Sequence, residues 1–73
     1  MKKDFYVVLG ENITNERTKQ GLEPEQIAKQ LGVTLGFWLL IERGLRHISP
    51  EQLIRLCNIF GCTAENLLTG VEW

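Results

Sequence analysis

The sequence predicts one all-α domain of five short helices. Apolar residues recur at helical spacing, and each such stretch is bounded by capping residues, by prolines at first helical positions or by glycines just past the end. No stretch shows the alternation of apolar and polar residues that is typical of a strand. At 73 residues the chain is long enough for one small domain, which we expect to span residues 1–73 with a short tail at 71–73.

The first two predicted helices each end at a glycine. Asp4 can cap the first, which ends before Gly21, and a proline flanked by acids at 23–25 opens the second, which ends at Gly32. Proline suits the first helical turn, and acids there face the positive end of the helix dipole. The residues expected to face the core are Phe5, Val8, Leu9 and Ile13 in the first helix and Ile27, Ala28 and Leu31 in the second.

The next three helices have clear start signals. Thr34 can cap the third, which runs to about Arg43 and stops at a glycine. Ser-Pro-Glu-Gln at 49–52 combines a serine cap, a proline at the first helical position and a capping-box glutamine. Thr63 can cap the last, short helix, which ends before Gly70. The inward residues of these last two helices are expected to be Leu53, Leu56, Cys57, Phe60, Leu67 and Leu68.

Net charge, apolar segments and cysteine spacing limit the classes of function that this chain can have. The net charge of −1 and the pI near 5.7 are unusual for a nucleic-acid-binding protein, which usually carries a basic patch. No segment approaches the ~20 apolar residues of a membrane span, and the start of the chain lacks a signal-peptide cleavage pattern, so we expect a cytoplasmic protein that does not enter membranes. In that setting Cys57 and Cys62, whose spacing fits neither a redox pair nor half of a zinc site, are expected to be reduced, buried and structural.

The sequence offers no candidate catalytic site. It contains no nucleophile–base pair, no carboxylate dyad in a plausible cleft and no glycine-rich phosphate loop. His47, the only histidine, has no cysteine or acid at ligand spacing, so it is expected to be a loop residue or a phosphate contact rather than a metal ligand. We therefore expect that this protein is not an enzyme and that it binds no cofactor and no metal.

Five segments carry a family resemblance: "LGENI", "ERTKQGL", "IAKQLGVT", "IERG" and "LIRLCNIFGCTAENLLTG". They resemble, over essentially the whole chain, the Cro/repressor-type (XRE family) helix-turn-helix transcriptional regulators of phage and bacteria. The resemblance implies a compact lambda-repressor-like fold in which the second and third helices form the helix-turn-helix. It also implies a structural ion pair between Arg17 and Glu42, and it assigns small, turn or core positions to Ala28, Gly32, Val33, Trp38 and Ile41.

The resemblance implies further that the third helix lies in the DNA major groove. The matching base-facing positions are almost all apolar: Thr34, Leu35, Gly36, Phe37, Leu39 and Leu40. Leucine cannot make the bidentate hydrogen bonds that distinguish guanine or adenine, although it can contact a thymine methyl. Arg43, Arg46 and His47 match positions that hold backbone phosphate, whereas Glu23 and Pro24 stand where the family usually has a polar residue that contacts phosphate.

A helical wheel separates the two faces of the third helix. At 100° per residue, Trp38 and Ile41 fall on one side and Leu39 and Leu40 on the opposite side, with Leu35 and Phe37 at the borders. The outward leucines predict an exposed apolar patch, unless the domain packs so as to cover it internally. A partner for this patch is one explanation, and Gly36 would allow such a partner to come close. Trp73 could fold back on the core or join a dimer.

Two functions fit these observations. The first is a DNA-binding transcriptional regulator that binds double-stranded DNA as a homodimer through an atypically hydrophobic recognition helix. The second is a helix-turn-helix that has become a protein-interaction or self-association module and modulates a partner regulator. In the second case the interface residues would be Leu35, Phe37, Leu39, Leu40 and Trp73.

Overall fold

The computed structural model describes residues 4–70, and every regular element in that range is a helix. The all-α fold class with five helices is therefore confirmed. Trp73, for which a contact with the core or a dimer was expected, lies outside the described residues. The helices are α1 (Phe5–Lys19), α2 (Pro24–Leu31), α3 (Leu35–Glu42), α4 (Pro50–Phe60) and α5 (Ala64–Leu67).

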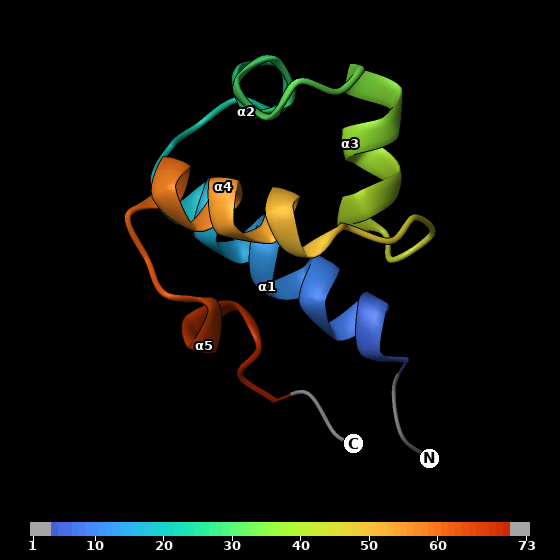
Figure 1. Cartoon of the computed structure of the whole chain (residues 1–73), viewed down its shortest axis with the longest axis vertical. Helices are drawn as coiled ribbons and strands as arrows, with labels where there is room; N and C mark the ends of the chain where they lie inside the picture. Colours follow the sequence, from blue (N-terminus) through green and yellow to red (C-terminus); the bar gives the residue numbers. More distant parts are fainter. Residues whose placement is uncertain (1–3, 71–73) are drawn as a thin grey trace.

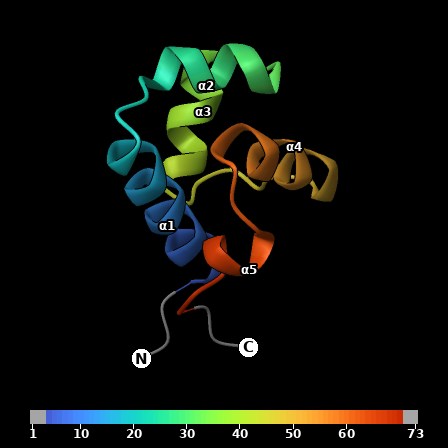
Figure 2. The same ribbon diagram turned by 90° about the vertical axis from the view of Figure 1, so that its left-hand side faces the viewer.

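The helices form an elongated body with α2 and α3 at one end. Figure 1 shows α1 and α4 crossing the middle of the molecule, with α5 below them and α2 and α3 above. The view turned by 90° in Figure 2 shows the same order along the long axis. The extents are 34 × 23 × 22 Å, and α3 packs against both α2 and α1. One end of the molecule therefore presents α2 and α3 together.

The predicted helix starts are confirmed by their hydrogen bonds. Thr34 Oγ1 accepts from the Phe37 amide at 3.1 Å, which caps α3. Ser49 Oγ accepts from the Gln52 amide at 3.1 Å, and Gln52 Oε1 accepts from the Ser49 amide at 2.9 Å, so the capping box of α4 is complete. At α2, Gln26 Oε1 accepts from the Glu23 amide at 2.8 Å. Each of these helix starts depends on residues close together in the sequence, so each could be predicted from the sequence.

One continuous apolar core joins all five helices. Trp38 is its largest fully buried side chain. Several residues expected in the core are only half-buried: Phe5, Val8, Leu53, Cys57 and Leu68. The buried members are Leu9, Ile13, Ile27, Ala28, Leu31, Trp38, Ile41, Leu56, Phe60 and Leu67.

The two cysteines meet at the end of α4. The Cys62 amide donates to the Cys57 carbonyl at 3.0 Å, and Gly61 between α4 and Cys62 has a φ of 67°. This is the geometry of a Schellman end, which brings the two side chains together at the edge of the core. Burial raises the pKa of the Cys62 thiol, and Cys57 and Glu16 raise it further. Both thiols are free, but each is half-buried at the edge of the core, so the expectation that they are buried was wrong.

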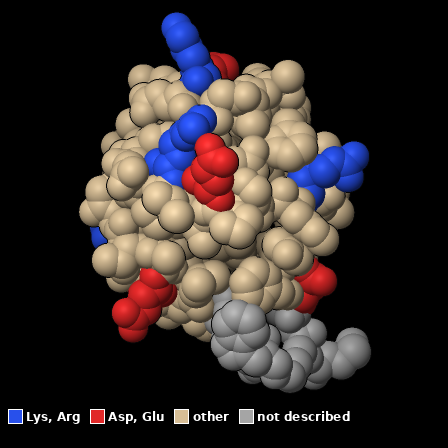
Figure 3. Space-filling view, in the orientation of Figure 1, with Lys and Arg blue, Asp and Glu red and all other residues tan. Residues whose placement is uncertain are grey.

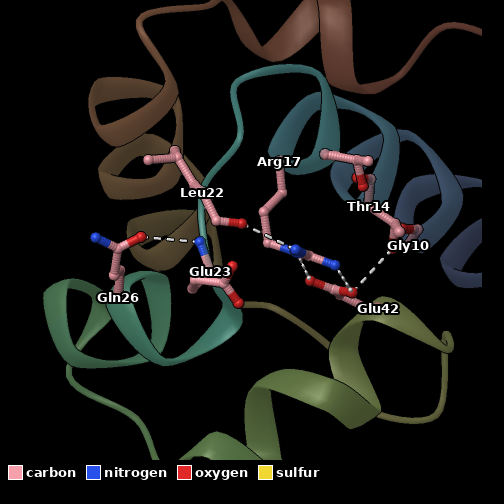
Figure 4. Close-up of polar contacts among 8 residues, drawn as sticks. Gly10, Thr14, Arg17, Leu22, Glu23, Gln26 and Glu42 are labelled. Atoms are coloured by element: carbon pink, nitrogen blue, oxygen red, sulfur yellow. Dashed lines mark hydrogen bonds and ion pairs between the residues drawn. The ribbon is translucent and has the colours of Figure 1, made fainter.

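Arg17 joins α1 to α3 and to the loop before α2 (Figure 4). Its Nε donates to Glu42 Oε2 at 2.7 Å, and its Nη2 donates to Glu42 Oε1 at 3.3 Å. Its Nη1 donates to the Leu22 carbonyl at 2.9 Å, and Thr14 Oγ1 donates to Glu42 Oε1 at 3.2 Å. The side chains of Arg17 and Glu42 are only 17% and 9% exposed, so the expected ion pair is present and largely shielded.

Two glycines allow α3 to lie directly against α1. A Cβ on Gly10 would come within 2.5 Å of the Glu42 carbonyl oxygen, and a Cβ on Gly44 would come within 2.7 Å of the Val7 backbone. Gly44 also has a φ of 76°, which disfavours any other residue. The contacts of both glycines are with backbone, so a larger residue would have to push α1 and α3 apart.

We expect Arg17→Ala or Glu42→Ala to lower the free energy of unfolding by about 3 kcal/mol, because either change leaves a shielded charge without its partner. Denaturant melts at neutral pH would measure the loss. Arg55→Ala is the matched control, since Arg55 forms only an exposed contact with Glu51 at 3.4 Å and its loss should cost under about 0.5 kcal/mol. Equal effects of the buried and exposed variants would contradict a structural role for the Arg17 pair.

We expect Trp38→Ala to cost about 3–5 kcal/mol of stability by opening a cavity in the core. Trp38→Phe should cost much less than that, because the buried Nε1 donates no hydrogen bond to any described residue and its removal relieves an unsatisfied polar group. Urea unfolding of both variants would test this pair of expectations. A Phe variant as unstable as the Ala variant would mean that Nε1 has a partner.

Candidate nucleic-acid interface

A tight turn sets the angle between α2 and α3. Gly32 has a φ of 80°, and the Val33 amide donates to the Ala28 carbonyl at 3.0 Å. The buried Ala28 is small enough for the two helices to approach each other behind this turn. Thr34 then caps α3, so the turn occupies only residues 32–34. This compact turn directs α3 from α2 back toward α1, which the last turn of α3 contacts.

α3 buries one face and exposes the other. Trp38 and Ile41 are buried against α1 and α2, whereas Leu35 and Leu39 are 39% and 38% exposed. Thr34 and Gly36 are also exposed, and Phe37 is half-buried. The helical wheel therefore assigned Leu39, Trp38 and Ile41 to the correct faces.

The wheel was wrong for Leu40, which is half-buried rather than open. Its carbonyl accepts from the Leu45 amide at 2.9 Å, and the Gly44 amide donates to the Ile41 carbonyl at 3.0 Å. This Schellman end brings the chain back beside Leu40, and the two side chains joined in this way commonly pack together. A wheel treats the helix as isolated, so it could not include this return of the chain.

Gly36 has no structural reason to be glycine. Its φ lies outside the left-handed region, and a Cβ built on it would meet nothing within 4 Å. Glycine inside a helix costs about 1 kcal/mol relative to alanine. The exposed face of α3 therefore has, between Leu35 and Leu39, a backbone that another molecule could approach closely.

Three basic or ionisable side chains follow the end of α3: Arg43, Arg46 and His47, all exposed. Within residues 4–70, neither arginine forms an ion pair, and Arg46 Nη1 contacts only the Leu45 carbonyl, at 3.1 Å. Their guanidinium groups are therefore available to an anion. Arg43 is the C-cap of α3, and Arg46 lies in the loop directly after it, so both follow the end of this helix.

His47 is held in place by an aromatic contact that the sequence did not predict. Its ring stacks on Tyr6 with the centroids 3.7 Å apart and the planes 10° apart. Phe5 meets Tyr6 edge-on, with centroids 5.0 Å apart. The start of α1 therefore supports the loop after α3. The neighbouring aromatic residues Phe5 and Tyr6 beside the Asp4 cap were the only sequence feature that could have indicated this contact. Residues 6 and 47 come together only in the folded protein.

Charge is sparse on this side of the molecule. In Figure 3 the surface where Figure 1 places α3 is mostly uncharged, and basic side chains project at the right-hand edge, where the loop after α3 lies. Glu23 and Glu25 are exposed at the start of α2, so an acid stands where a phosphate contact would be expected. The site combines an apolar centre with a few cations at one border.

Other site types find no support in the part of the chain that the structure describes. No group of three or more metal-binding side chains occurs within residues 4–70. None of the described helices has both the length and the apolar character needed to cross a membrane.

Comparisons with known proteins identify a family and several solved structures with the same fold. The model of a helix-turn-helix domain family matches residues 8–68. The clp gene regulator ClgR of Corynebacterium glutamicum is 24% identical with a TM-score of 0.86, over 92% of this chain and 87% of that one, which shows a shared fold. The restriction-modification controller protein C.AhdI of Aeromonas hydrophila is 26% identical with a TM-score of 0.79, over 85% of this chain and 94% of that one.

A third solved structure, the hypothetical transcription factor NHTF from Neisseria, is 26% identical with a TM-score of 0.80, over 89% of this chain and 75% of that one. No curated protein sequence matches the chain significantly. The match to the family model covers most of the chain and includes the turn, the buried face of α3 and the Arg17–Glu42 pair. The chain therefore belongs to the helix-turn-helix domain family.

Proposed function

We propose that this protein is a small transcriptional regulator that binds double-stranded DNA with α3 in the major groove. The observation that carries the proposal is the free outer face of α3, bordered by Arg43 and Arg46, which have no acidic partner among the described residues. An α-helix presented in this way fits the major groove. Family membership and the regulators of similar fold add support.

Arg43, Arg46 and His47 supply affinity rather than sequence preference in this proposal. Guanidinium groups at the end of a recognition helix meet backbone phosphate, which fixes the orientation of the protein on the duplex. With about two or three phosphates neutralised per monomer, the logarithm of the binding constant falls with the logarithm of salt concentration by about 0.9 per phosphate. This shallow dependence suits a chain whose net charge is −1.

We propose that the protein binds as a homodimer. One domain of this size buries little DNA surface, and the operators of two-fold symmetric regulators repeat their half-sites about one helical turn apart. A dimer would also double the number of phosphate contacts. The proposed role is regulatory and cytoplasmic, and it includes no catalysis, metal or cofactor.

A second candidate function is a protein-interaction module. It is favoured by the exposure of Leu35 and Leu39 on a helix with few polar side chains, because an apolar helix face is suited to a groove on another protein. In that case Leu35 and Leu39 would lose their contact with water in the complex, together with Phe37 and the exposed part of Leu40. On DNA, the same leucines would face a hydrated and charged groove.

We expect Arg43→Ala and Arg46→Ala each to weaken binding to all DNA sequences about equally. Each change removes a phosphate contact, so the slope of affinity against salt should become shallower by about one unit. Fluorescence anisotropy on random-sequence duplexes over a salt series would measure both effects. Lys19→Ala makes the same charge change at the far end of α1 and should leave the slope unaltered. Wild-type binding by the double variant would exclude DNA contact by these two residues.

We expect the double change Leu35→Gln, Leu39→Gln to leave the fold intact, since both side chains are exposed. If α3 serves DNA binding, the mass in solution should not change. If α3 serves protein association, an oligomer should become a monomer, because a few anchors carry most interface energy. Light scattering would distinguish the two. Ile54→Gln, at a 65% exposed site on α4, is the control for loss of surface apolar area.

A further inference from the structure

We propose that Leu35, Gly36 and Leu39 form a surface that reads the C5-methyl groups of pyrimidines in the major groove. The ligand is duplex DNA that carries thymine or, equally, 5-methylcytosine. This inference rests on the proposed DNA-binding function and specifies what α3 recognises. We call these three residues the methyl-reading surface.

The methyl-reading surface has almost no polar side-chain chemistry. Among the exposed positions from residue 34 to residue 39, only Thr34 carries a polar side-chain atom. Its hydroxyl oxygen already accepts the Phe37 amide hydrogen at 3.1 Å, which leaves mainly its own proton to donate. Side-chain hydrogen-bond readout by residues 34–39 is therefore restricted to one hydroxyl group.

The major groove offers an apolar side chain one distinctive target. Guanine, adenine and unmethylated cytosine present hydrogen-bonding edges, whereas thymine adds a methyl group at C5. A leucine placed against the polar edges removes their water and supplies no hydrogen bond in return, whereas a leucine placed against a methyl group buries apolar area on both sides. Leu35 and Leu39, one helical turn apart, can contact methyl groups on neighbouring base pairs. The preference that follows is for methylated pyrimidines.

The same chemistry makes no distinction between thymine and 5-methylcytosine at this position. Both bases carry a methyl group on C5, at the same place on the major-groove edge. The groups in which they differ, the exocyclic oxygen and amine at C4, are read by hydrogen bonds that Leu35 and Leu39 cannot make. Cytosine methylation should therefore convert a poor G·C contact into a favourable one.

Gly36 provides an independent reason to expect close contact with a ligand on this face. Nothing lies within 4 Å of a Cβ built there, and its backbone is not in the left-handed region, so the protein itself does not need glycine. The absence of a side chain lets the α3 backbone approach the floor of the groove. That approach is what short-range methyl contacts by the flanking leucines require.

The test compares four alternating duplexes at one salt concentration: dA-dT, dA-dU, dG-dC and dG-5-methyl-dC. Uracil differs from thymine only by the missing methyl group. We expect the full-length protein to bind dA-dT and dG-5-methyl-dC about tenfold more tightly than their unmethylated counterparts, as two leucines would each gain from one buried methyl group. Fluorescence anisotropy would measure the four dissociation constants.

Variants separate a direct methyl contact from an effect of methylation on DNA shape. The Leu35→Gln, Leu39→Gln variant should bind with ratios near one, whereas Arg43→Ala should weaken binding to all four duplexes and keep the ratios. Gly36→Ala should raise the melting temperature of the protein, since alanine favours the helix, and should weaken binding to the methylated duplexes.

The outcomes distinguish this inference from the proposed function. Binding without dependence on the methyl group would overturn the methyl-reading surface and leave DNA binding in place. A methyl preference that persists in the double leucine variant would also overturn it, because the preference would then come from elsewhere. Failure of the wild-type protein to bind any of the four duplexes at low salt would overturn the proposed function itself.

Discussion

The ion pair between Arg17 and Glu42 is the contact on which the placement of the proposed DNA-binding helices depends. It joins α1 to the last turn of α3, and a third hydrogen bond from Arg17, to the Leu22 carbonyl, holds the loop that leads into α2. No polar or charged residue is fully buried within the described range, so the core itself supplies apolar packing without directional contacts. The Arg17 side chain thus provides a directional link among α1, α3 and the loop before α2.

The glycine contacts explain why this link can form. Gly10 lets the Glu42 backbone lie against α1, and Gly44 lets the chain after α3 pass close to Val7. At that separation the Arg17 side chain reaches Glu42 with two hydrogen bonds. The stacking of His47 on Tyr6 then fixes the following loop to the start of α1. The basic border of α3 is therefore positioned by α1 as well as by α3 itself.

Local features of this protein could be predicted from its sequence, and features that depend on the fold could not. The caps at Thr34 and Ser49 were predictable because they involve residues only three positions apart. The Arg17–Glu42 pair was expected from a family resemblance, since nothing local joins residues 25 positions apart. The partial burial of Leu40 and the stacking of His47 depend on where the chain returns after α3.

The apolar outer face of α3 reconciles an acidic chain with DNA binding only if recognition requires few polar contacts. A recognition helix that reads by hydrogen bonds gains specificity from each donor and acceptor, whereas leucines gain it from the position of methyl groups. In the proposed function, Arg43 and Arg46 would orient such a helix on the phosphate backbone. Moderate affinity with weak dependence on salt is the expected result.

The way in which α3 is anchored has an evolutionary consequence. Trp38, Ile41 and Glu42 hold this helix through its inner side, and Gly44 ends it against α1. Residues 35, 36 and 39 are exposed, so mutations there should change the proposed recognition surface at less cost in folding than mutations of the buried side. Descendants of this sequence could acquire new targets by replacing those three residues while the buried side of α3 stays unchanged. The present apolar surface is then one of several possible recognition surfaces that the same buried side of α3 could hold in place.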